Sequence, residues 1–535
     1  MHTEIKNKIL AFSLVMIMVF VGSCVPAKTT ETQAPVVTQA PVTTEAPTVA
    51  VDNRPNIIIA TAYLNETHDP TANYNIEVPI LTNIYDNLIF RDYGSDGSGS
   101  APLPGLAESW TQTSPTEWTI KLRQGVKFHN GTEMTSEDVV FTLFSQDRLN
   151  KDWSAMGQAF ANVEAVDKYT VKVTTKFPDP AFVSRLQTYI GQVVPKAYYT
   201  EVGEDKFGIS PIGTGPYQLT EFVPNDHVTL TAFDDYWGGK PPVKTITFKA
   251  VPELSSRIAG LFKGEYDIAL GIPPDQFEVV EAAQGIKVVG SLVDNFTALA
   301  FQTNHKGKPE ANEAFRQAMV YAIDRNLLTQ TLWKGLTKPP LGYQFLSYGK
   351  YYNPDFQGIT YDPTKVKDLL TQSGYNGEEV LVQYLKGYFP VYDQAMEVMQ
   401  QMWKDAGINV RLEPLESWTL FKYDTAALTS TSFSADITDP DNLLKYYSPD
   451  SWNVTSGISS PSAEETALAQ TLQTSMDFTE RYSAFQQLLK IFDTKCIILP
   501  IWYQYYAYGM RDSIQMVPYS NFGLDFREGK ITFTP

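Results

Sequence analysis

The sequence predicts an α/β protein with more than one lobe, and an N-terminal segment that directs the chain out of the cytoplasm. Apolar residues alternate with a period of two in some segments and recur every three or four residues in others, from Asn56 to the C-terminus. No long linker interrupts this mixture, which favours one continuous folded body. A third observation, an apolar N-terminal run that ends in a cysteine, indicates export.

The first 23 residues are typical of a secretory signal peptide. Lys6 and Lys8 precede an apolar run at residues 9–21, which is shorter than the about 20 residues that a membrane-spanning helix needs. The run ends in Val21-Gly-Ser-Cys24, which resembles the lipobox of bacterial lipoproteins. We therefore expect residues 1–23 to be removed and Cys24 to carry the lipid that holds the protein at the membrane. A plain signal peptide with a chance cysteine is the alternative.

Residues 24–50 are expected to form a lipidated stalk. After Cys24 they consist almost entirely of Thr, Pro, Ala, Val and Gln, a composition that cannot build a core. Proline keeps such a chain extended, with a reach on the order of 80 Å. The stalk would separate the folded part from the membrane surface.

Charge and cysteine content exclude other classes. The formal net charge is −18, so binding to a nucleic-acid backbone is not expected. With Cys24 acylated, Cys496 is the remaining cysteine and no intrachain disulfide can form. Cys496 begins an apolar run, Cys-Ile-Ile-Leu, and is expected to be a buried structural thiol.

The first predicted elements are strands and a capped helix. Trp118, Ile120 and Leu122 alternate with polar residues, and the same alternation recurs from Tyr169 to Phe177, which predicts strands with one wet face. Thr135 and Asp138 form a capping box for a helix that begins around Glu137.

The later predicted elements repeat an order of helix, glycine and strand. One repeat is a helix at 253–263, Gly264 and a strand at 266–270; another is a helix at 395–406, Gly407 and a strand at 408–412. Residues 315–323 form a further helix, because their apolar residues share one stripe.

The motifs of common enzymes are missing. The sequence has no Gly-x-x-x-x-Gly-Lys-Ser/Thr, no Gly-x-Ser-x-Gly and no His-Glu-x-x-His. Its five histidines are scattered, so no metal or other cofactor is expected. Asp436, Asp439 and Asp441 could serve acid/base chemistry, which leaves a secreted hydrolase with paired carboxylates as the alternative of another class.

A series of segments resembles one known family, and the segments occur in that family's order. They are Leu106-Ala-Glu-Ser-Trp110, Gly125-Val-Lys-Phe-His-Asn-Gly131, Ser136-Glu-Asp-Val-Val140, Gly213-Thr-Gly-Pro-Tyr217, Tyr236-Trp-Gly-Gly-Lys-Pro-Pro242, Gly264-Glu-Tyr-Asp-Ile268, residues 315–325, Tyr361-Asp-Pro, Ala435-Asp436 and Asp439-Pro-Asp-Asn442. Together they resemble the extracellular solute-binding proteins of family 5, the peptide and nickel binding components of ATP-driven (ABC) importers.

The resemblance implies a two-lobed periplasmic-binding-protein-like fold (type II, large cluster) with an extra inserted domain. It places lobe one at 51–85, 215–295 and 501–535, the inserted domain at 86–214, and lobe two at 296–500. It also implies that a solute is buried as the lobes close and is then handed to the permease subunits of the membrane. A monomer suits the family.

The resemblance also implies where the solute binds. Peptide-binding members have a Trp-x-x-Asp-x-x-Asp-Pro stretch whose first aspartate pairs with the α-ammonium of the ligand, and that aspartate corresponds to Asp436. Phe433 stands where the family often has tryptophan. A turn or cap role for Asp436 is the alternative.

Two further ligand classes stay open. Aromatic residues make up 13% of the chain, and some family members stack sugar rings on Trp and Tyr. An oligosaccharide could therefore be held by Trp418 and Trp452, with Tyr446, Tyr447 and Trp502 as further candidates. A metal chelate is disfavoured by the scarce histidines. An oligopeptide is the leading expectation.

Overall fold

The structure, a computed structural model, describes residues 52–71, 78–145, 159–455 and 457–534. The predicted signal peptide, Cys24 and the stalk lie outside the described residues. A compact unit begins at Asn53. Among the residues that are described, no helix is both long and apolar enough to cross a membrane.

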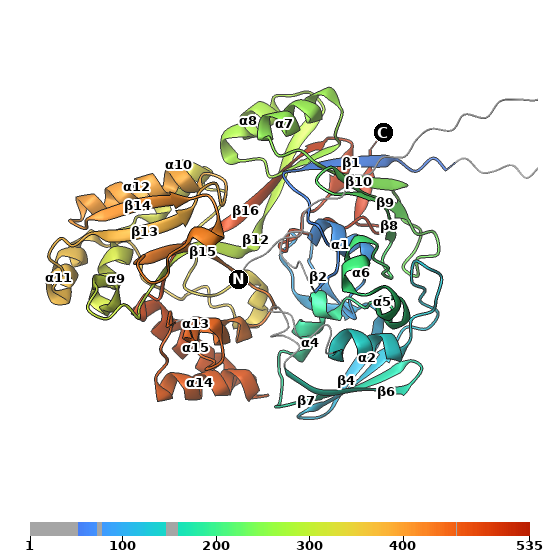
Figure 1. Ribbon diagram of the computed structural model, residues 1–535, viewed down its shortest axis with the longest axis horizontal. Helices are drawn as coiled ribbons and strands as arrows, with labels where there is room; N and C mark the ends of the chain where they lie inside the picture. The colour runs from blue at the N-terminus through green and yellow to red at the C-terminus, as the bar shows by residue number, and fades with distance from the viewer. Residues whose placement is uncertain (1–51, 72–77, 146–158, 456, 535) are drawn as a thin grey trace, which may run out of the picture. The chain divides into compact units, whose positions relative to one another are not determined.

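A ten-stranded sheet forms the centre of this unit (Figure 1). Its strands, in spatial order, are β14 (Val410–Leu415), β13 (Val380–Leu385), β15 (Leu428–Ser434), β12 (Ile286–Phe301), β16 (Ile498–Arg511), β11 (Ile268–Leu270), β1 (Asn56–Thr61), β10 (Thr245–Ala250), β9 (His227–Ala232) and β8 (Tyr217–Val223). Strands from residues 380–434 therefore lie at one end, and strands from residues 56–250 lie at the other.

Two long antiparallel strands join the two halves of the sheet. β12 has 16 residues and β16 has 14, and Figure 1 shows them side by side between the two groups of shorter strands. Their register shifts between Leu292 and Phe296 and again between Thr297 and Ala298. Such bulges bend and twist a strand pair locally, which allows the two halves to take different orientations on one continuous sheet.

The half built around β1 confirms one predicted repeat. Helix α7 (Leu254–Lys263) ends at Gly264, whose φ of +79° is the left-handed conformation that glycine adopts without strain, and β11 follows. β1 pairs in parallel with both β10 and β11. Ile59, Phe248 and Tyr508 are buried in the core that this half shares with helix α1 (Val78–Ile84).

A second, four-stranded antiparallel sheet lies in the segment predicted to be inserted. Its order is β4 (Ala107–Ser114), β5 (Glu117–Leu122), β7 (Thr170–Thr175) and β6 (Phe160–Asp167). The alternating patterns predict two of these strands, β5 and β7. Helix α2 (Ser136–Phe144) contacts this sheet, and its capping box is confirmed because the Thr135 backbone N–H donates to the Asp138 carboxylate at 2.9 Å. The division into lobes and an inserted domain, with its boundaries, stays a prediction.

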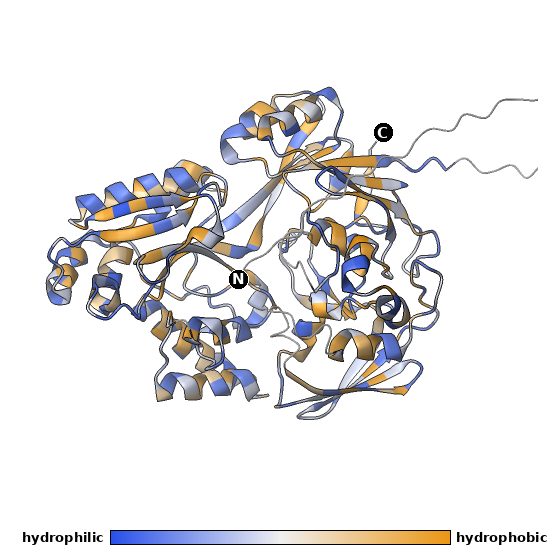
Figure 2. Cartoon of the chain, in the orientation of Figure 1, coloured by the Kyte–Doolittle hydropathy of each residue, from blue (hydrophilic) through white to orange (hydrophobic). Residues whose placement is uncertain are grey.

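Helices α9 (Glu313–Tyr321) and α12 (Tyr392–Asp405) bury the apolar stripes that predicted them. Phe315, Met319, Met399 and Trp403 have no exposed surface. Helix α9 is shorter than predicted and ends before Ala322 and Ile323, although both remain buried. Figure 2 shows hydrophobic and hydrophilic residues along these helices, as expected for helices with one face on a core.

The C-terminal helices α14 (Ala463–Thr474) and α15 (Phe478–Lys495) cover a third core rich in aromatic rings. Cys496 follows α15, is 2% exposed, and has a thiol whose pKa is raised by burial, which confirms the predicted buried thiol.

The other elements are α4 (Phe182–Leu186), α5 (Lys196–Val202), α6 (Glu204–Ile209), α8 (Phe277–Glu281), α10 (Arg325–Trp333), α11 (Pro363–Ser373), α13 (Trp452–Thr455), β2 (Ile89–Asp92), β3 (Ala101–Pro104), β17 (Ile514–Met516), β18 (Ile531–Phe533) and the short 3-10 helices η2 (Tyr189–Gly191), η3 (Pro274–Gln276), η4 (Pro309–Ala311), η5 (Leu346–Tyr351), η6 (Trp418–Leu420) and η7 (Pro440–Tyr446).

Candidate ligand-binding pocket

A pocket of about 330 Å³ is lined by segments that are far apart in the sequence. Residues from α1, β2, the α4–η2 region, β12, the segment after β15 and the C-terminal loop contribute to it. They include Thr82, Asn87, Arg91, Tyr93, Gln187, Thr188, Tyr189, Asp294, Asp436, Thr438, Tyr519, Ser520 and Asp525. The volume lies in the range of small-molecule sites, and the wall combines aromatic rings with a few charged groups.

Asp436 stands on the wall of this pocket, two residues after β15 ends. Its side chain is half-buried, and the loss of water raises the pKa of its carboxyl while the Lys445 ammonium opposes that rise. The Asp436 charge in turn acts on the hydroxyl of Tyr189, another residue of the wall. A carboxylate in such a setting accepts strong hydrogen bonds from a ligand.

Two arginines hold the segment that follows Asp436. Asp439 caps η7 by accepting from the Asp441 N–H at 2.9 Å, and its carboxylate receives two hydrogen bonds from Arg481, at 2.7 and 3.1 Å. Asp441 accepts a hydrogen bond from Arg185 of α4, which also contacts Asp179 at 2.9 Å. All of these side chains are buried, so the segment is held from both sides.

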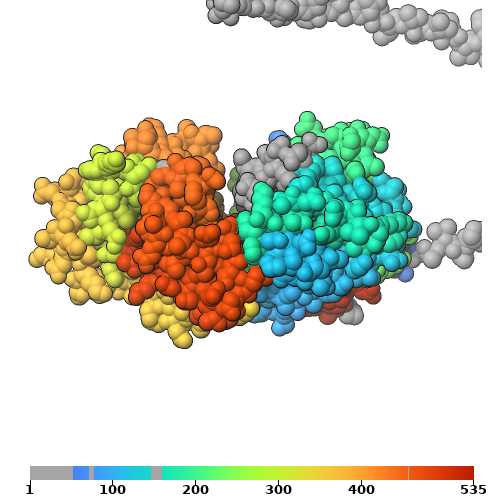
Figure 3. Space-filling view, turned by 90° about the horizontal axis from the view of Figure 1, so that it is seen from below, coloured from blue at the N-terminus to red at the C-terminus, as the bar shows by residue number. Residues whose placement is uncertain are grey.

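These contacts connect parts of the chain that lie far apart in the sequence. Thr438 Oγ1 adds a hydrogen bond to Gln187 at 3.1 Å, beside the bond between Arg185 and Asp441. Figure 3 shows the orange surface, which belongs to the segment that includes β15, α14 and α15, meeting the green-to-blue surface of the residues before 215. The pocket therefore has walls from both of these segments.

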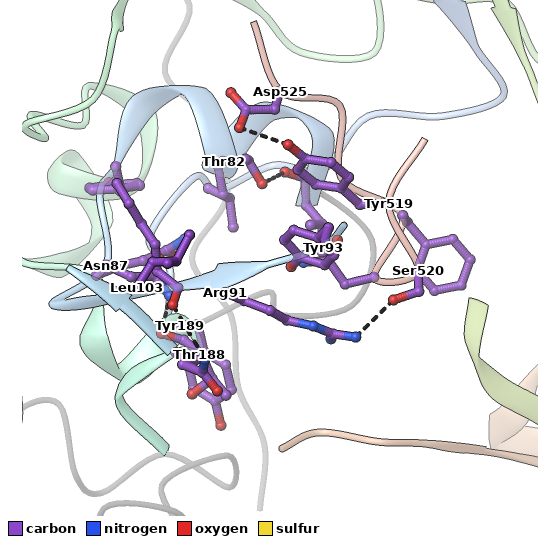
Figure 4. A pocket seen from close by; sticks show the side chains of 18 of the residues that line it. Thr82, Asn87, Arg91, Tyr93, Leu103, Thr188, Tyr189, Tyr519, Ser520 and Asp525 are labelled. Atoms are coloured by element: carbon purple, nitrogen blue, oxygen red, sulfur yellow. Dashed lines mark hydrogen bonds between the residues drawn. The ribbon is translucent and has the colours of Figure 1, made fainter. Parts of the chain in front are cut away.

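A second cluster of charges forms another part of the wall (Figure 4). Arg91 donates to Asp294 at 2.6 Å and to the Ser520 hydroxyl at 2.9 Å, and that hydroxyl donates to Asp294 at 3.0 Å. The Arg91 guanidinium also lies 4.6 Å from the centre of the Tyr93 ring, which stacks on Tyr519 at 3.9 Å. The charges of Arg91 and Asp294 largely cancel each other within this cluster. The rings of Tyr93 and Tyr519, next to it, line the pocket.

The other predicted site residues do not line this pocket. Phe433 is 5% exposed and packs on Phe296, Tyr343 and Tyr446, because its position in β15 turns it into the aromatic core. Tyr446, Tyr447 and Trp502, weighed as sugar platforms, are likewise buried. A ligand role for Phe433 stays a prediction that its burial disfavours.

Trp418 and Trp452 lie on the surface, in a row of rings. Trp418 is 43% exposed and stacks on Phe421 at 5.1 Å; Phe421 stacks on Tyr423 at 6.1 Å, and Tyr423 meets Trp452, 58% exposed, at 5.9 Å. Their binding role remains a prediction.

Sequence reasoning missed Arg91, Tyr93, Tyr189, Asp294 and Tyr519. They come from four separate segments, and none belongs to a motif with a recognisable chemistry. Among the described residues, no group of three or more His, Cys, Asp or Glu side chains is placed to hold a metal ion.

Comparison with known proteins supports the assignment that these features suggest. The profile of the bacterial extracellular solute-binding proteins, family 5 (middle part), matches residues 101–454. The glutathione-binding protein GsiB of Escherichia coli O6:K15:H31 is 28% identical over 374 residues, which cover 68% of this chain and 70% of that protein. The dipeptide-binding protein of Escherichia coli K12 is 26% identical over 399 residues, with coverages of 68% and 72%.

Solved structures share the fold. The ABC transporter substrate-binding protein CtaP of Listeria monocytogenes aligns with a TM-score of 0.79 at 23% identity over 90% of this chain and 100% of its own. The periplasmic binding protein DppA of Helicobacter pylori, solved with the peptide STSA, aligns with a TM-score of 0.76 at 23% identity over 90% and 99%. NikZ of Campylobacter jejuni, solved with Ni(L-His), aligns with 0.75 at 18% over 89% and 99%.

These likenesses confirm the predicted class, a two-lobed α/β protein of the periplasmic-binding-protein type. The chain belongs to family 5 of the bacterial extracellular solute-binding proteins.

Proposed function

We propose that this protein captures a peptide-like solute in the pocket beside Asp436 and delivers it to the permease subunits of an ABC importer. The observation that carries the proposal is a half-buried carboxylate on the wall of a pocket, in a family whose relatives include a dipeptide-binding protein and a glutathione-binding protein. Asp436 would accept hydrogen bonds from the N-terminal end of the peptide.

The surroundings of Asp436 support this role. The ion pairs of Asp439 and Asp441 hold the following segment in place before a ligand arrives. A site held in advance loses little entropy when it binds. The rings of Tyr93, Tyr189 and Tyr519 offer apolar surface to the side chains of a peptide.

The protein releases its solute unchanged in this proposal. Asp439 and Asp441, which sequence reasoning kept as possible acid/base groups, are each engaged by a buried arginine. Neither carboxylate lines the pocket, so neither is within reach of a solute held in it. The family assignment points in the same direction.

An oligosaccharide is the second candidate ligand. The row of rings from Trp418 to Trp452 has two partly exposed indoles; the rings of Trp418, Phe421 and Tyr423 stack on one another, and Trp452 meets Tyr423 edge-on. Sugars bind proteins by laying their apolar faces on such rings.

The location of the protein is part of the proposal. Cys24 would carry the lipid, residues 24–50 would form the stalk, and a monomer would work outside the cytoplasmic membrane. Lobe one would comprise 51–85, 215–295 and 501–535, the inserted domain 86–214, and lobe two 296–500. The long strands β12 and β16 would serve as the connection about which the lobes close.

Native mass spectrometry of the purified protein tests the proposed ligand class. The protein is incubated with a library of tripeptides and tetrapeptides and, separately, with a library of oligosaccharides. We expect saturable binding of unmodified peptides. Binding confined to sugars would replace the peptide proposal with the oligosaccharide one, and the appearance of cleaved products would overturn the binding function.

A further inference from the structure

One carboxamide in the wall of the pocket has an oxygen without a hydrogen-bond partner. Gln192 directly follows η2 and lines the pocket, and the residue is 8% exposed. Its Oε1 is buried and accepts no hydrogen bond from the described residues. Of all the buried side-chain polar atoms that lack a partner in the described part of the chain, this oxygen alone belongs to a residue of the pocket wall. A buried acceptor left unpaired costs stability, so its position in a pocket indicates a partner that arrives with the ligand.

The backbone holds Gln192 in this position. An antiparallel bridge pairs Gln192 with Asn87, and the preceding carbonyl, that of Gly191, accepts from the Leu88 N–H at 2.8 Å. Residues directly opposite each other in such a pair carry their side chains on the same face. Asn87 lines the pocket as well, so the bridge directs both carboxamides to it.

The neighbouring amide donors are engaged elsewhere. Asn87 Nδ2 donates to the Thr188 carbonyl at 3.0 Å, and Figure 4 shows these two residues close together at the pocket. Gln187 Nε2 donates to the Phe90 carbonyl at 3.3 Å. Neither nitrogen is therefore offered to Gln192.

A peptide supplies the missing donor, because each of its residues other than proline carries a backbone N–H. An N–H that enters the pocket gives up its hydrogen bond to water, and Gln192 Oε1 replaces that bond. An ester analogue has an oxygen in place of the N–H. It would set two acceptors against each other and leave both unpaired, which a site built around a hydrogen bond rejects strongly.

We propose that Gln192 is a ligand-binding residue that selects peptides by accepting a hydrogen bond from a backbone N–H of the solute. The inference rests on the proposed function, because it takes this pocket to be the peptide site. Asp436 would meet the terminus of the peptide, and Gln192 would meet an amide of its backbone.

The test is a competition between peptides and their ester analogues. A tripeptide library is synthesised in its natural form and in two further forms, in which an ester oxygen replaces the N–H of the first or of the second peptide bond. Each ester form is mixed in equal amounts with the natural form and offered to the full chain. Bound ligands are then released and counted by liquid chromatography and mass spectrometry. For the natural protein we expect the amide form to be favoured at least about tenfold at one of the two positions.

Removal of the oxygen should abolish that preference. Gln192→Met keeps the length of the side chain without the carboxamide, and we expect the ratio at that position to fall to within about threefold of one. Gln192→Ala, which has a smaller side chain, should give the same result. Gln401→Met is the matched control, because Gln401 is exposed on α12 and does not line the pocket; it should keep the natural ratio.

Thermal unfolding without ligand separates a binding role from a structural one. Gln192→Met removes an unpaired buried acceptor, so we expect it to unfold at a temperature no lower than the natural protein does. A clearly lower temperature would show that the carboxamide serves the fold, and would overturn the inference.

The other outcomes separate the inference from the function on which it rests. A natural protein that binds both ester forms within about threefold of the amide form, or Gln192 variants that keep the natural ratio, overturn the role of Gln192 while peptide binding stands. Failure of the natural protein to bind any member of the amide library overturns the proposed function, and the inference with it.

Discussion

His129 connects two segments that the sequence places more than eighty residues apart. Its Nδ1 accepts from the Gly213 N–H at 3.2 Å, and its Nε2–H donates to the Gly215 carbonyl at 3.0 Å. A Cβ at Gly213 would lie 2.1 Å from the Ile84 carbonyl oxygen, so only glycine fits this turn. Both bonds require the neutral imidazole, since protonated Nδ1 could no longer accept.

This arrangement makes stability depend on pH. Burial lowers the pKa of His129 from 6.5 to about 4, although the bond to Gly215 opposes that shift. At pH values between about 4 and 6.5, the imidazole of His129 is protonated in the unfolded chain but not in the folded chain. The stabilising effect of His129 is thus complete above pH 6.5 and is lost as the pH falls toward 4. The full loss amounts to about 3 kcal/mol.

Urea unfolding over this pH range checks the prediction. We expect the free energy of unfolding to fall more steeply with acid in the natural protein than in His129→Gln, which has no group to titrate at this position. Equal slopes in the two proteins would show that His129 is not responsible.

Asp436 carries the second prediction at this scale. Asp436→Asn keeps the shape of the side chain but removes the charge that a peptide terminus would meet. We expect peptide affinity to fall by about tenfold to a hundredfold, the effect of losing a charged hydrogen bond of about 1.5–3 kcal/mol. Isothermal titration calorimetry measures it, with exposed Asp450→Asn as the control. Undiminished affinity would remove Asp436 from the site.

At the scale of the element, the segment after β15 depends on ion pairs that no local pattern predicts. The resemblance located the Asp-Pro-Asp-Asn stretch at residues 439–442. Its partner Arg481 lies 42 residues later on α15, and Arg185 lies 256 residues before its partner Asp441. The cost of burying these charges is offset only because the tertiary fold supplies both partners.

Breaking one of these pairs should therefore destabilise the protein. Asp439→Asn can still cap η7 but leaves the buried Arg481 without its counter-charge. We expect the free energy of unfolding to fall by about 3–5 kcal/mol, measured by thermal or urea unfolding. Glu416→Gln breaks an exposed pair with Lys386 and should cost at most about 1 kcal/mol. Similar effects in both variants would contradict this account.

At the scale of the whole molecule, the proposed lipid on Cys24 determines where the protein is found. A serine cannot form the thioether, so Cys24→Ser should move the protein from the membrane fraction to the soluble extracytoplasmic fraction. Cell fractionation followed by mass spectrometry of the N-terminal peptide measures both location and acylation. A variant that stays in the membrane fraction would exclude Cys24 as the anchor, and residues 1–23 would then need another explanation.

Much of the fold follows from local patterns. The strands at Trp118 and Val171, the capped helix α2, and the helices α7 and α12, which stop shortly before Gly264 and Gly407, follow from local periodicity and end signals. Helix α9 is the partial exception. It ends at Tyr321 although the apolar stripe continues, because Asp324 caps the next helix, α10, by accepting from the Leu327 N–H at 2.9 Å. Ile323 stays buried between the two helices in sequence.

The sequence by itself determined the class of protein, several of its strands and helices and, through family resemblance, one residue of the pocket wall, Asp436. Periodicity, helix ends and ordered motifs are local properties, and they survive without knowledge of the fold. The tertiary structure decided the rest: that Phe433 faces the core, and that Arg91 and Asp294 share the pocket with Asp436. These facts depend on distances between segments far apart in the chain, which are set when the cores pack.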